Sequence, residues 1–201
     1  MTVVEVSPPT PEEWVGYMHE RYAGRWDARV GAYVVATREL YRPPESTETL
    51  SNFPTPRSWT RLALLLQQLK PDREVMLALS VGTVGPESGA KFVEFVSLRV
   101  PEPSDVVRKP SLLKDLRGDL RRLMLATVLT ATYVGERGDV EAAYRLLKFM
   151  LEELAEPAIV LIAALPKDVS KKVLVRVAVD ISKGRISVSE QFMRVWRLRV
   201  E

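Results

Sequence analysis

Residues 55–71 read TPRSWTRLALLLQQLKP, and this stretch predicts an amphipathic helix with one buried face. Thr55 is a favoured N-cap residue, and Pro56 suits the first helical position because the N–H there has no intrahelical partner. Apolar residues then recur at helical spacing until Pro71 ends the pattern. The apolar positions are Trp59, Leu62, Ala63, Leu66 and Leu69.

The same kinds of signal continue along the chain and predict helices almost throughout. Thr10, Pro11 and Glu13 predict one capped helix start, and Asp139 predicts another. A surface loop is expected over 41–54, where Pro, Ser and Thr replace any periodic pattern. Helices are expected over 11–22 and 28–40, from 86 to the break at 101–103, and over 112–133, 139–154, 158–165, 169–181 and 188–199, with a short apolar segment over 75–79.

The expected fold class is therefore all-α, with one helical domain over residues 8–72 and a second over 73–201. The boundary is placed near Pro71 and Asp72, where the pattern of residues 55–71 ends. One segment allows two interpretations. The alternation of apolar residues over 173–179, followed by the Lys183-Gly184 step, also fits a β-hairpin within 173–188.

The composition excludes several classes of protein. The 201 residues are 46% hydrophobic and 27% charged, which is typical of a globular protein. A net charge of +3 allows a nucleic-acid partner without requiring one. The absence of cysteine excludes disulfides and thiol catalysis. The longest uncharged apolar run, over 158–165, is too short to span a bilayer, and no signal peptide is evident, so a cytoplasmic protein without membrane contact is expected.

Two apparent motifs for catalysis or metal binding are incomplete. Residues 82–91 resemble a phosphate-binding loop, but Ala90 and Phe92 flank Lys91 where a Walker A loop needs glycine and a hydroxyl residue. These glycines are interpreted as a turn before a helix. His19 begins a zincin pattern, but Ala23 replaces the second histidine. His19, the single histidine of the chain, is predicted to be a partly exposed helix residue, and no metal site or histidine-based triad is expected.

Arg57 points to a function because its position is electrostatically unfavourable. If Thr55 is the N-cap, Arg57 is the second helical residue, at the positive end of the helix dipole. Arg61 adds a like charge one turn later on the same face. A nearby anion such as a phosphate would explain both residues. Pairing of Arg57 with a carboxylate of the preceding loop, Glu45 or Glu48, is the simpler alternative.

A second basic feature lies in the helix expected over 112–133. Lys114, Arg117 and Arg121 form a stripe at i, i+3 and i+7 that would suit phosphate contacts. A solvated face with salt bridges to neighbouring acidic residues is the simpler interpretation. No aromatic residue lies among them, so a nucleic-acid partner is not expected. The expected C-terminal helix is also basic, through Arg194, Arg197 and Arg199.

The segment FPTPRSW over 53–59 resembles the Ser/Thr-Pro-Arg segment in the lid of MoxR-type AAA+ ATPases. The position that matches the family's sensor 2 arginine, which contacts the nucleotide phosphates, is Arg57. The resemblance covers nearly the whole chain, although only residues 53–59 are sharply specific. The other similar stretches are PEEW over 11–14, VGTVG over 81–85 with Phe92 and Phe95, PEPSD over 101–105, and the closing helix from Phe192 to Trp196.

The resemblance implies an AAA+ lid-like helical bundle followed by a second helical bundle, without the nucleotide-binding core. It also favours a helix over a hairpin for residues 173–181. The chain has no Walker A, Walker B or sensor 1 motif, so it is not expected to be an enzyme on its own; ATP and Mg²⁺ would be bound by the core.

The partners that the resemblance implies are the AAA+ core domain, identical subunits in a ring and a von Willebrand A-type co-protein. The activity it implies is chaperone-like remodelling, with Arg57 as the phosphate sensor and Arg61 as a secondary phosphate or interface contact. The alternative is a stand-alone helical adaptor or nucleic-acid-associated protein that uses Lys114, Arg117 and Arg121.

Overall fold

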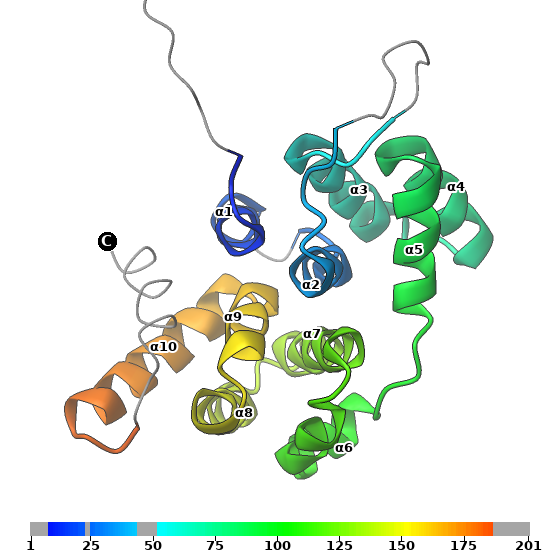
Figure 1. Ribbon diagram of the computed structural model, residues 1–201. Coiled ribbons are helices and arrows are strands. Elements are labelled where there is room, and N and C mark those ends of the chain that lie inside the picture. The colour runs from blue at the N-terminus through cyan, green and yellow to red at the C-terminus, as the bar shows by residue number, and fades with distance from the viewer. Residues whose placement is uncertain (1–7, 23–24, 44–51, 187–201) are drawn as a thin grey trace, which may run out of the picture.

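The computed structural model describes residues 8–22, 25–43 and 52–186, and every regular element in these ranges is a helix (Figure 1). The expected all-α class is confirmed. The helix expected over 188–199 and the Phe192 to Trp196 stretch lie outside the described residues. The elements are α1 (Pro11–Tyr22), α2 (Ala28–Thr37), α3 (Pro56–Leu69), α4 (Arg73–Val84), α5 (Pro86–Val96), α6 (Pro103–Arg108), the 3₁₀ helix η1 (Pro110–Leu116), α7 (Leu120–Glu136), α8 (Val140–Glu153), α9 (Ala155–Ala164) and α10 (Lys167–Ser182).

The first hydrophobic core is built around Trp59 of α3, which is fully buried. Its indole packs against the rings of Tyr33 and Phe92, with ring centroids 5.3 and 6.3 Å away. Helices α1 to α5 supply most of this core. The core extends beyond the expected boundary near Pro71, because Phe92 and Phe95 of α5 belong to it.

The second core lies among α6, η1 and α7 to α10. Helix α7 separates the two cores, with α2 on one side and α6 and α8 on the other (Figure 1). Leu125 and Val128 of α7 pack in the first core, whereas Ala126 and Ala131 pack in the second. Helix α9 is shared in the same way, because Val160 faces the first core. The two cores therefore share two helices.

Two stretches differ from the sequence-based expectation. The short apolar segment over 75–79 belongs to a full helix, α4, whose N-cap Asp72 accepts a hydrogen bond from Val75 N at 2.9 Å. The prediction of a single helix over 112–133 is wrong. Its first part is the 3₁₀ helix η1, and α7 starts afresh after Asp119, whose carboxylate accepts from Arg122 N at 3.2 Å. Asp119 prefers to cap a helix rather than continue one, which explains the restart.

The end of the described chain resolves the choice between helix and hairpin. Residues 173–182 are helical, as part of α10. The apolar alternation of this stretch reflects burial of Val173 and Val177, one turn apart, while Val175 and Val179 remain exposed. The helical interpretation is therefore confirmed as far as Ser182.

His19 is buried, so the prediction of a partly exposed side chain is wrong. It is 6% exposed and lies where α1 packs against α9. Its Nδ1 is 3.0 Å from the carbonyl oxygen of Ala163, and its Nε2 is 3.5 Å from Ser170 Oγ. Because a carbonyl only accepts, Nδ1 carries the proton. Both partners are far along the sequence from His19, which is why local pattern did not reveal the burial.

Helices α4 and α5 approach each other closely. A β-carbon placed on Gly89 of α5 would lie 2.5 Å from the backbone nitrogen of Val81 and 2.6 Å from the carbonyl carbon of Ser80. Glycine at this position therefore allows the two backbones to touch. The turn between the helices is at Gly85, whose φ of +91° also favours glycine. Residues 82–85 thus contain the predicted turn, although Gly82 itself is helical.

Candidate functional site

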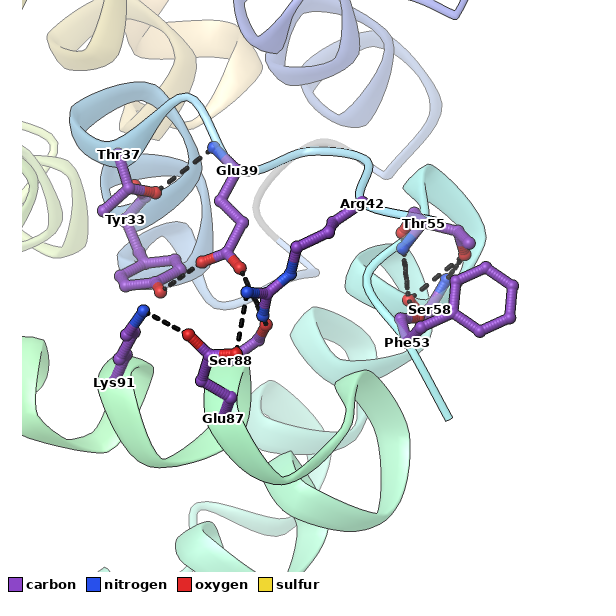
Figure 2. Close-up of polar contacts among 10 residues, drawn as sticks. All are labelled: Tyr33, Thr37, Glu39, Arg42, Phe53, Thr55, Ser58, Glu87, Ser88 and Lys91. Atoms are coloured by element: carbon purple, nitrogen blue, oxygen red, sulfur yellow. Dashed lines mark hydrogen bonds and ion pairs between the residues drawn. The ribbon is translucent and has the colours of Figure 1, made fainter. Parts of the chain in front are cut away.

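The start of α3 is fixed by reciprocal hydrogen bonds. Thr55 has an extended backbone, and its Oγ1 accepts from Ser58 N at 3.0 Å. Thr55 N donates in return to Ser58 Oγ at 2.8 Å. The Ser58 hydroxyl also donates to the Phe53 carbonyl at 3.1 Å (Figure 2). Thr55 is therefore the N-cap, as predicted, and the turn before the helix is fixed to the first helical turn.

Neighbouring segments also form hydrogen bonds to residues 52–59. Arg42 N donates to the Pro54 carbonyl at 3.1 Å. The Asn52 side chain donates to the Gly82 carbonyl of α4. Trp59, in the first turn of α3, is buried in the first core. Residues 52–59 are thus attached to the segment after α2, to α4 and to the core, so the first turn of α3 has a defined position.

A network of charged and hydroxyl groups centred on Arg42 connects the segment after α2 to the start of α5 (Figure 2). Arg42 Nη1 donates to Glu87 Oε2 at 2.8 Å, and Arg42 Nη2 lies 2.9 Å from Glu39 Oε1. Ser88 Oγ accepts from Arg42 Nη2 and donates to Glu39 Oε1, both at 2.8 Å. Tyr33 donates to the other Glu39 oxygen at 2.8 Å. Burial, followed by this bond to Glu39, raises the pKa of Tyr33 far above its usual value.

The network compensates its own charges. Lys91 Nζ donates to Glu87 Oε1 at 2.6 Å, and this bond, with the nearby Arg42, lowers the pKa of Glu87. Two carboxylates and two cations therefore face one another. This cluster joins the segment after α2 to α5, and the backbone of Arg42 links that segment to Pro54, just before α3. The Glu87/Lys91 spacing was visible in the sequence, but the long-range contacts of Arg42 were not.

Arg57 and Arg61 are both exposed on α3, one turn apart. No ion pair includes either residue within the part of the chain that the structure describes. The alternative partners Glu45 and Glu48 lie outside the described residues, so that interpretation stays open. The first turn of α3 contains no acidic residue, and its cap is uncharged.

Helix α2 provides a comparison within the same molecule. Arg29 occupies the second position of α2, as Arg57 does in α3. The N-cap of α2 is Asp27, and Arg29 Nη2 bonds to its carboxylate at 2.6 Å. A cation at this position is thus compensated in α2 by an acidic cap. In α3 the cap is Thr55, so the guanidinium of Arg57 and the positive end of the helix dipole add together. The arrangement suits a phosphate or another compact anion.

The basic stripe of Lys114, Arg117 and Arg121 does not lie on one helix. Lys114 belongs to η1, whereas Arg121 lies in the first turn of α7. Lys114 Nζ bonds to Glu153 Oε1 at 2.8 Å, which lowers the pKa of Glu153. Arg117 donates to the Glu153 carbonyl and lies 3.8 Å from its carboxylate. The expected face is therefore broken, and two of its three cations are paired with one glutamate.

Over residues 8–22, 25–43 and 52–186 there is no cluster of three or more side chains of the metal-ligating types. In the same ranges, no helix has the length and apolar character needed to cross a membrane.

Comparison with known proteins gives no further constraint. No family model, curated protein or solved structure matches the chain. The resemblance to MoxR-type ATPase lids therefore depends on the sequence motifs, of which residues 53–59 are the sharpest. The chemistry of Arg57 provides the strongest independent argument for a site.

Proposed function

We propose that this chain is the lid and C-terminal region of a MoxR-type AAA+ ATPase, in which Arg57 senses the nucleotide phosphates. The observation that carries the proposal is the contrast between Arg57 and Arg29. Both occupy the second position of a helix, but only Arg29 has an acidic N-cap as its partner. A cation that has no ion pair among the described residues, on a firmly held helix start, is well suited to recognise an anion supplied from outside them.

In this proposal the ATPase core supplies the phosphate cradle and Mg²⁺, and the present chain supplies a cation at a fixed position. Arg57 would form charge-assisted hydrogen bonds to the γ-phosphate, and Arg61 would add a secondary contact to phosphate or to the neighbouring subunit. Movement of α3 would pass to the rest of the chain through Trp59, which is packed against α2 and α5. The chain alone would not hydrolyse ATP. Its partners would be identical subunits in a ring and a von Willebrand A-type co-protein.

The test is ATP turnover by the chain joined to a Walker-type core, with Arg57→Ala and Arg57→Lys compared with the parent. A charge-assisted hydrogen bond contributes roughly 1.5–3 kcal/mol, so Arg57→Ala is expected to lower kcat by about tenfold or more. Arg57→Lys should recover part of the loss, since it keeps the charge without the bidentate geometry. Unchanged turnover and ring assembly in Arg57→Ala would refute the sensor assignment.

Arg73→Ala is the matched control. Arg73 is an exposed arginine in the first turn of α4, but the acidic residues Asp72 and Glu74 lie beside it in the sequence. Its removal changes the net charge equally and should leave turnover unchanged. An equal loss from Arg73→Ala would indicate a general effect of surface charge rather than a sensor.

The alternative, a stand-alone nucleic-acid-associated protein, is less well supported for the surface of Lys114, Arg117 and Arg121. Glu153 pairs with Lys114 and Arg117, and the third cation, Arg121, lies on another element. Phosphate binding there would have to compete with these ion pairs.

A further inference from the structure

An open hollow of about 630 Å³ lies between the end of α1 and the outer face of α3. Its lining combines guanidinium groups, a phenol ring, two carboxamides and an aliphatic side chain, and includes no acidic residue. The lining residues are Arg21, Tyr22, Arg25, Leu64, Gln67 and Gln68.

A third arginine lies on the same face of α3. Residues 61, 64 and 68 are spaced i, i+3 and i+7, so Arg61 lies above Leu64 and Gln68 along one side of the helix. The distance along the axis from Arg61 to Gln68 is about 10 Å. Helix α3 contains no acidic residue along its whole length. Cationic groups therefore line one end of the hollow and continue beyond it.

The three arginines offer guanidinium donors to an external partner, although Nε of Arg25 donates to the Tyr22 carbonyl at 3.4 Å. Arg21, Arg25 and Arg61 are exposed, and within the described ranges none of them forms an ion pair. The acidic groups nearest in sequence are Glu20, which is exposed and adjacent to Arg21, and Asp27, which follows Arg25 by two residues and is paired with Arg29 at 2.6 Å. Of these two carboxylates, only that of Glu20 is without an ion pair among the described residues.

Tyr22 gives the hollow an aromatic surface. Its ring lies edge-on to that of Tyr17, with centroids 6.1 Å apart, so Tyr17 supports it from one side. A hydrogen bond with Tyr17 is also the main reason that the pKa of Tyr22 is raised. Bases stack on such rings regardless of sequence, and the exposed carboxamide of Gln68 offers both donors and an acceptor to a base edge.

We propose that this hollow binds single-stranded nucleic acid, with a base against Tyr22 and backbone phosphates at Arg21, Arg25 and Arg61. A single strand fits better than a duplex because a base within a duplex is already stacked and cannot reach a recessed ring. The site does not include Arg57, but it shares Arg61 with the proposed ATPase role, so the variants that test it are made at Arg21, Arg25 and Tyr22.

The test is fluorescence anisotropy with the full chain and a labelled oligothymidylate of about 12 nucleotides, at several salt concentrations. The double variant Arg21→Ala/Arg25→Ala is compared with Arg73→Ala/Arg145→Ala, which removes two exposed arginines elsewhere. Loss of two phosphate contacts should reduce the slope of log affinity against log salt by about 1.4. The control pair should leave both slope and affinity close to those of the parent.

Two further variants test the stacking and the local charge. Tyr22→Leu should weaken binding by about 5-fold to 150-fold with little change in salt slope, because it removes a stacked base and no phosphate contact. Glu20→Gln should strengthen binding. Circular dichroism of each variant verifies folding.

Several outcomes would overturn the proposal: an equal loss in the two double variants, equally tight binding of a duplex, or unaltered binding by Tyr22→Leu. If an acidic peptide competes with the oligonucleotide and Tyr22→Leu leaves binding unchanged, the partner would be a protein instead. Arg57→Ala should leave oligonucleotide binding unchanged. Failure of the ATPase test and failure of this one are therefore distinguishable.

Discussion

Replacing Gly89 with alanine tests the close packing of α4 against α5. The new β-carbon would lie 2.5 Å from Val81 N and 2.6 Å from the Ser80 carbonyl carbon, both of which are helix backbone and cannot rotate away. Gly82→Ala is the matched control, because a β-carbon on Gly82 meets no atom within 4 Å. Both substitutions replace a helical glycine, so both gain up to about 1 kcal/mol of helix propensity.

The two variants are expected to change stability in opposite directions. Gly82→Ala should raise the free energy of unfolding by about 0.4–1 kcal/mol. In Gly89→Ala, the helices must separate by at least 0.5 Å for the closest contact to reach the 3.0 Å below which real β-carbons are essentially never found. Overpacking of this kind costs about 1–3 kcal/mol or more, which exceeds the propensity gain. The variants should therefore differ by about 2 kcal/mol.

Urea unfolding followed by tryptophan fluorescence and circular dichroism measures this difference. In thermal unfolding, a difference of about 2 kcal/mol in the free energy of unfolding corresponds to midpoint temperatures that differ by roughly 4–8 °C for a chain of this size. If Gly89→Ala proves as stable as Gly82→Ala, the two helices do not approach as closely as described and the reasoning fails.

Two further predictions concern the surroundings of the start of α3. Thr55→Ala should lower the free energy of unfolding by about 1 kcal/mol through loss of the cap, and Thr55→Ser should restore it; equal urea midpoints for all three proteins would contradict the capping role. The raised pKa of Tyr33 means that the unfolded chain ionises first, from its ordinary value of 10.0 upward, so this contribution to stability is fully present below pH 10 and declines as pH rises. Urea midpoints measured up to pH 11 should therefore fall more steeply for the parent than for Tyr33→Phe, and parallel curves would exclude Tyr33 as the cause.

Sequence reasoning succeeded where the signal is local. The caps at Thr10, Thr55 and Asp139 were correct because each involves residues within three positions of one another. The restart of the helix at Asp119 was missed, although that residue also acts as a local cap, because the apolar spacing continues across η1 and α7. Apolar periodicity predicted one continuous helix there, whereas the cap at Asp119 begins a new one.

Long-range partners could not be predicted. His19 is buried against Ala163, which lies 144 residues away in the chain. The Lys114 contact with Glu153 and the Arg42 contacts with α5 likewise join distant segments. The position of Arg57 as the second helical residue could be predicted, because it depends only on the cap at Thr55. The support of its helix by Arg42 required the fold.

The sharing of α7 and α9 between the two cores has a mechanical consequence. A hinge requires a plane that few packed side chains cross, but Leu125, Val128 and Val160 cross the junction here. Bending between the halves would open apolar surface on both sides of α7 at once. The described chain should therefore respond to a force on α3 as a stiff body. A small displacement near Trp59 should move α8 and α10 by a similar amount.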